Sequence, residues 1–141
     1  MTRRSALALL TLAVAVPALA ADEKSPLEGK WTVTALTRDG KADKSLDGAV
    51  RDHAGDKYSV TPAAGSTAVK VEGTAVIDAA KKTLDMKPSA GRYKDKTLQG
   101  IFKLDGDTLT VAFSEPGKDR PTAFESKDGS GVVVVVHTKA K

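Results

Sequence analysis

A two-residue turn between two alternating apolar runs constrains the fold of this chain more than any other feature. The runs cover residues 98–104 and 107–113, and Asp105-Gly106 joins them. Asp-Gly between alternating runs is the strongest short-range signal for a β-hairpin, because glycine readily takes the left-handed backbone conformation that such turns require. The chain is therefore predicted to contain antiparallel strands joined by tight turns.

Further short runs with strand character precede and follow this hairpin. They are expected over residues 30–37, 57–61, 68–78, 83–87 and 132–138, with turns rich in Gly, Asp or Pro between them. The stretch 42–54 is less regular and is interpreted as a helical turn or a loop, followed by a short strand that begins near residue 49. Seven or eight short strands without an amphipathic helix predict an all-β fold, either an antiparallel barrel or a sandwich.

The N-terminal stretch has the composition of a secretory signal peptide. Arg3 and Arg4 precede an uncharged apolar run over 6–16, and Ala18-Leu19-Ala20 supplies a small-x-small cleavage pattern. The run is well short of the roughly 20 residues that span a bilayer, so no stable membrane anchor is expected. We predict a signal peptide over 1–20, a flexible lead-in over 21–26, and one domain over 27–141, exported to the periplasm or the medium by the general or the twin-arginine route.

Composition excludes several classes of function. Loss of Arg3 and Arg4 with the leader lowers the formal net charge from +4 to +2, and the lysines are interleaved with aspartates instead of forming a basic face. Nucleic-acid binding, which needs a basic stripe with stacking aromatics, is therefore not expected. The chain has no cysteine, which excludes disulfides, thiol chemistry and thiolate metal sites.

No motif specifies a reaction. The sequence has no phosphate loop, nucleophile elbow or dinucleotide fingerprint. Its two histidines, His53 and His137, are far apart in the sequence, and we expect them at the surface or at the rim of the fold. Metal sites and acid–base pairs need clustered ligands, so the chain is predicted to be non-catalytic, without a cofactor and without a metal.

Gly29-Lys30-Trp31, at the head of the first strand-like run, matches the G-x-W signature of lipocalins. From Leu27 to about His137 the chain resembles the uncharacterised lipocalin-like domains of secreted planctomycete proteins, most clearly over 27–31, 55–58, 100–109 and 116–124. The resemblance implies a lipocalin-like meander barrel of about eight strands, in which Gly29 lets the chain enter closely and Trp31 plugs the closed end. Lipocalins often pack a basic side chain over this tryptophan, and Arg120 is the candidate here.

The inward faces of the predicted strands carry uncharged residues. The candidate pocket lining is Val33, Tyr58, Val71, Met86, Phe102, Val111 and Phe113. A ligand buried among them is expected to be uncharged or lipid-like, because no inward ion pair is predicted.

The sequence is compatible with two functions. The barrel binds a small hydrophobic ligand, or it is filled by its own side chains and serves as a structural or protein–protein interaction module. The second alternative rests on Val132–Val136, a run that is apolar on both faces and is a candidate surface for self-association.

Overall fold

The computed structural model describes residues 25–140. The predicted signal peptide and most of the lead-in lie outside the described residues. Within them the chain forms nine strands: β1 (Gly29–Arg38), β2 (Lys41–Ala42), β3 (Val50–Ala54), β4 (Lys57–Thr61), β5 (Val71–Asp78), β6 (Thr83–Pro88), β7 (Leu98–Asp105), β8 (Thr108–Ser114) and β9 (Val132–Lys139). No helix of the described part of the chain is both long and apolar enough to cross a membrane.

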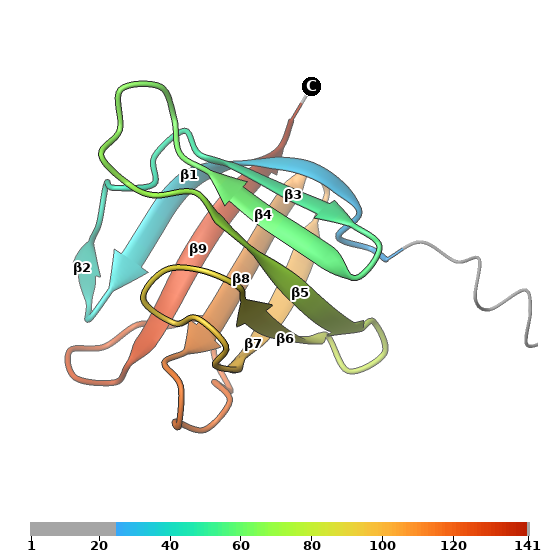
Figure 1. The fold of residues 1–141 in the computed structure, drawn as a ribbon. Helices are drawn as coiled ribbons and strands as arrows, with labels where there is room; N and C mark the ends of the chain where they lie inside the picture. The colour runs from blue at the N-terminus through green and yellow to red at the C-terminus, as the bar shows by residue number, and fades with distance from the viewer. Residues whose placement is uncertain (1–24, 141) are drawn as a thin grey trace, which may run out of the picture.

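The strands form one closed antiparallel barrel (Figure 1). From β3 onward each strand pairs with the next along the chain, β1 pairs with β3, and β9 returns to pair with β1 along most of its length. Eight strands make the barrel, and the two-residue β2 is an extra strand on the end of β1. The predicted all-β, lipocalin-like meander barrel is confirmed, and the sandwich alternative is excluded.

The hairpin predicted from Asp105-Gly106 is present between β7 and β8. Asp105 pairs with Thr108, and Gly106 has a φ of 61°, the left-handed conformation that favours glycine there. The valine-rich β9 pairs with β8 on one side and β1 on the other. Both backbone edges of β9 are therefore occupied, and a partner can reach this strand only through its outward side chains.

One register shift changes the inward face of β1. The first half alternates as expected, with Trp31 and Val33 buried, but the pairing with β9 is irregular between Val33 and Ala35. Beyond this bulge Leu36 points inward and Ala35 is exposed, so the alternation of the first half does not continue to the end of the strand. An inserted residue moves the following side chains to the opposite face of a strand, because side chains alternate with a period of two.

The two ends of the barrel have different connections. At one end the strands are joined by tight turns at 54–57, 78–83 and 105–108, and β1 begins and β9 ends there. At the other end, on the left in Figure 1, longer segments at 43–49, 62–70, 89–97 and 115–131 connect the strands. We call these the closed end and the open end.

Trp31 lies at the closed end, as the resemblance implied. It is 2% exposed, and its indole Nε1 donates a hydrogen bond to the carbonyl oxygen of Leu27 at 3.0 Å. The ammonium of Lys139 lies 4.9 Å from the centre of the ring, because Lys139 is the residue that pairs with Trp31 across β1 and β9. Gly29, with a φ of 108°, begins β1 beside them.

The assignment of Arg120 as the lid over Trp31 is wrong. Arg120 belongs to the long 115–131 segment and packs on the barrel wall at β6 and β7. It forms an ion pair with Asp85 at 2.7 Å and donates hydrogen bonds to the carbonyl oxygens of Gly100 and Leu84 at 2.8 and 3.3 Å. Lys139 occupies the place over the tryptophan instead, since the last strand ends next to the start of the first.

Candidate functional site

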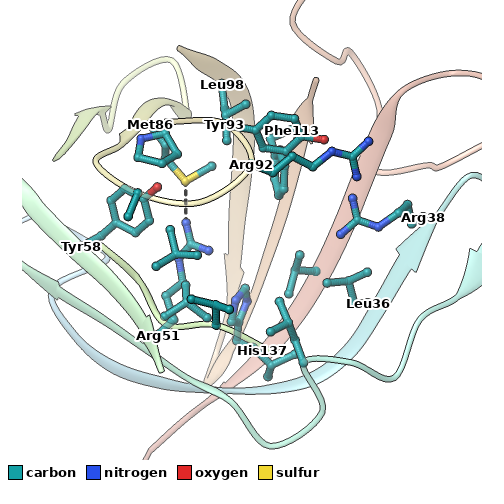
Figure 2. A pocket seen from close by; sticks show the side chains of 18 residues that line it. Leu36, Arg38, Arg51, Tyr58, Met86, Arg92, Tyr93, Leu98, Phe113 and His137 are labelled. Atoms are coloured by element: carbon teal, nitrogen blue, oxygen red, sulfur yellow. Dashed lines mark hydrogen bonds between the residues drawn. The ribbon is translucent and has the colours of Figure 1, made fainter. Parts of the chain in front are cut away.

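A cavity of about 230 Å³ lies inside the barrel toward the open end (Figure 2). Its wall comes from all eight strands of the barrel and from the loops at the open end. The lining residues are Val33, Leu36, Arg38, Leu46, Arg51, Tyr58, Val60, Val69, Val71, Met86, Pro88, Ala90, Arg92, Tyr93, Leu98, Phe113, Val135 and His137. The wall is mostly apolar, as expected for a site that binds small organic molecules.

The structure places five of the seven predicted lining residues around this cavity. They are Val33, Tyr58, Val71, Met86 and Phe113. The other two, Phe102 and Val111, are buried opposite each other on β7 and β8 and belong to the packed core outside the cavity. Alternation predicts that a side chain points inward, but the distance from the closed end decides whether it meets packed neighbours or open space.

Arg51, on β3, is a cation within the barrel. It is 4% exposed and lies between β1 and β4, with Trp31 and Val60 as its cross-strand partners. Its Nε donates to His53 Nε2 at 3.0 Å and its Nη2 to Met86 Sδ at 2.7 Å, the contact drawn as a dashed line in Figure 2. The guanidinium carbon is 5.4 Å from the centre of the Tyr58 ring.

No acidic side chain balances this cation within the described part of the chain. The residues around the cavity include three arginines and neither Asp nor Glu, and the ion pairs of residues 25–140 do not involve Arg51. Burial lowers the pKa of Arg51 to about 10, which leaves the side chain charged at neutral pH. The expectation of an interior without charge is therefore wrong.

The two histidines are also inside the barrel, which corrects their predicted place at the surface or rim. His53 is 1% and His137 0% exposed. Burial is the main cause that lowers the pKa of each to about 3, and the positive charge of Arg51 acts in the same direction. Both rings are therefore neutral near pH 7.

The hydrogen bonds of these rings determine which nitrogens carry protons. His53 accepts from Arg51 at Nε2, so its proton is on Nδ1, and His137 Nδ1 lies 3.1 Å from the carbonyl oxygen of Leu109, to which it donates. His53 Nδ1 and His137 Nε2 have no partner among the described residues. In residues 25–140 no group of three His, Asp or Glu side chains is arranged to hold a metal ion.

The mouth of the cavity carries the other two arginines. Arg38, at the end of β1, pairs with Asp43 at 3.3 Å, and Arg92, in the 89–97 loop, lies 5.3 Å above the ring of Tyr93. The Tyr93 hydroxyl is buried beside the cavity and has no hydrogen-bond partner among residues 25–140. Polar groups thus occur at two depths, at the mouth and around Arg51.

Sequence reasoning missed Arg51 and His53 because β3 reads Val-Arg-Asp-His-Ala. Hydrophobicity alone favours Val50 as the inward residue, whereas the pairing with β1 and β4 turns Arg51 and His53 inward. The signal that was present is their spacing of two, which places them on one face of any strand.

Comparisons with protein-family models, with curated proteins and with solved structures find no match for this chain. The cavity and its side chains are therefore the basis for any functional conclusion.

Proposed function

We propose that this chain is a non-catalytic binding protein that holds one small, largely apolar ligand inside its barrel, and that it belongs with the lipocalin-like proteins that its G-x-W start resembles. The observation that carries the proposal is the cavity of about 230 Å³ with mostly apolar walls. A dry apolar cavity of about 150 Å³ accepts benzene in another protein, so the volume here suits a somewhat larger molecule. Each methylene group buried in such a site contributes roughly 0.8 kcal/mol.

The position of the cavity supports the same function. It lies beneath the long loops of the open end, while the closed end is plugged by Trp31 and Leu27. Leu46 and Val69 belong to the open-end loops and line the cavity, and Val69 is 72% exposed, so the proposed route of entry passes these two residues. Small β-barrels hold single ligands in this manner.

A filled barrel that acts through its surface has less support. The interior leaves a volume that its own side chains do not occupy. The outward valines of β9 are half-buried, and both edges of that strand are paired within the barrel. Self-association through Val132–Val136 would depend on these outward side chains alone.

Titration calorimetry with octanoate and 1-octanol tests the proposal. Val71, on the inward face of β5, lines the cavity, whereas Val76 on the same strand points outward and is 71% exposed. We expect saturable binding of at least one compound to the wild type and to Val76→Trp, and binding at least tenfold weaker to Val71→Trp, whose indole would fill the cavity. Absence of saturable binding, or equal binding by both variants, would contradict the proposed function.

A further inference from the structure

The charge balance of the cavity is its least expected property. Arg51 brings a full positive charge to a position that is 4% exposed, and the side chains that contact it are neutral: the His53 ring, the Met86 thioether and the Tyr58 ring. Arginine is rarely so buried without a paired anion, because removing an ion from water costs several kcal/mol that neutral groups offset only in part. The protein maintains an uncompensated cation beside an open space.

The guanidinium also has unused hydrogen-bonding capacity. Arginine carries five N–H donors, and in the described residues only Nε and one N–H of Nη2 have acceptors, His53 and Met86. A thioether is a weak acceptor, so even this second contact is readily exchanged for a stronger one. Arg51 therefore presents donors that a planar, negatively charged oxygen pair would satisfy.

We propose that the ligand is a small amphiphilic carboxylate that enters head first, so that its carboxylate pairs with Arg51 and its apolar part extends toward the open end. This inference rests on the proposed binding function and specifies its ligand class. A guanidinium binds a carboxylate through two parallel N–H···O bonds, which supplies both direction and strength. One unpaired cation inside the barrel matches one negative charge on the ligand.

The remainder of the wall fits an apolar tail. Around Arg51 the cavity wall includes aliphatic side chains, among them Leu36, Val60 and Val71. At the mouth, the charge of Arg38 is balanced by Asp43, whereas Arg92 has no ion pair within residues 25–140. Arg92 thus adds a positive field at the entrance, which attracts anions and disfavours cations.

Three ligands with one alkyl chain and different head groups test the proposal: octanoate, 1-octanol and octylamine. By calorimetry at neutral pH we expect the wild type to bind octanoate at least tenfold more tightly than 1-octanol, and octylamine more weakly than either. Arg51→Met should remove the preference for octanoate over 1-octanol, while Arg120→Met, the same change on the barrel wall, should retain it. Thermal melting of each variant shows that it is folded.

The outcomes separate this inference from the function on which it rests. Equal affinity of the wild type for octanoate and 1-octanol, with Val71→Trp blocking both, would overturn the carboxylate assignment and leave the binding function standing. An undiminished preference for octanoate in folded Arg51→Met would overturn the role of Arg51. No binding of any of the three compounds to the wild type would overturn both the function and the inference. Because the wild-type comparison uses no variant, it decides the ligand class even if Arg51→Met fails to fold.

Discussion

A cation lies beside an aromatic ring both at the closed end and in the cavity, but it is exposed to water in the first place and buried in the second. At the closed end Trp31 is buried with its indole N–H bonded to Leu27, and Lys139, exposed on the end of β9, covers the ring with its charge in water. In the cavity beneath the open end the cation itself is buried, since Arg51 lies beside the Tyr58 ring within the barrel. At the closed end the charge is solvated and the buried indole N–H is hydrogen-bonded, as in a stable core. The cavity instead holds a buried cation without a paired anion among residues 25–140. Such departures are expected at functional sites, where stability is given up for binding.

The largest effect on stability is expected at the closed end. Trp31→Ala removes a buried indole from a packed region and should lower the free energy of unfolding by roughly 3–5 kcal/mol. Val71→Ala, at the cavity wall, should lower it much less, because the side chain is only half-buried and already faces open space. Urea denaturation of both variants measures the difference. Wild-type stability in Trp31→Ala would refute the placement of this residue as the floor of the barrel.

The buried histidines make stability depend on pH. Each has a pKa of about 3 in the folded chain, against an ordinary value of 6.5, so the unfolded chain binds more protons between these values. The stabilisation is therefore fully present above about pH 6.5 and is lost as the pH falls toward 3, with a slope of up to about 1.4 kcal/mol per pH unit for each ring.

His137→Gln isolates one of these contributions. A glutamine amide retains a donor for the Leu109 carbonyl but does not titrate. Urea denaturation at about pH 6.5 and pH 5 should show a smaller loss of stability for the variant than for the wild type. An equal loss in both proteins would mean that His137 is not held neutral by burial.

The smallest expected effect on stability is the difference between substituting two arginines, Arg120 and Arg51, in the protein without ligand. Arg120 has a carboxylate and two backbone carbonyls as partners, so Arg120→Met should lower the free energy of unfolding by about 1–2 kcal/mol. Arg51→Met removes a buried, uncompensated charge and should leave stability unchanged or raise it. Chemical denaturation distinguishes the two. A larger destabilisation by Arg51→Met than by Arg120→Met would show that Arg51 is a structural residue.

The fold was predictable because its signals are local. Asp105-Gly106 fixes a hairpin between neighbouring runs, and the alternation in β4 and β7 matches the pleat of a strand buried on one face. The lid over Trp31 was assigned to Arg120 because the family pattern calls for a basic residue, but only the closure of β9 onto β1 shows that this residue is Lys139.

The polar residues of the site could not be predicted in the same way, because this requires knowing which face of each strand points into the barrel. In β9 both faces are valine up to position 136, so composition does not indicate that Val133, Val135 and then His137 form the inner face. In β3 the inner face carries Arg51 and His53, against the hydrophobic pattern. Pairing with neighbouring strands decides both cases, and that information lies far away in the sequence.

The most direct test of a functional open end is a map of amide chemical-shift changes as octanoate is added to the ¹⁵N-labelled protein. We expect saturable changes that concentrate around the cavity, at Arg51, Val60 and Val71, with little change at the closed end near Leu27. Saturable changes confined to the outward face of β9 at Val132–Val136, or no changes at all, would contradict the assignment of the open end as a binding site.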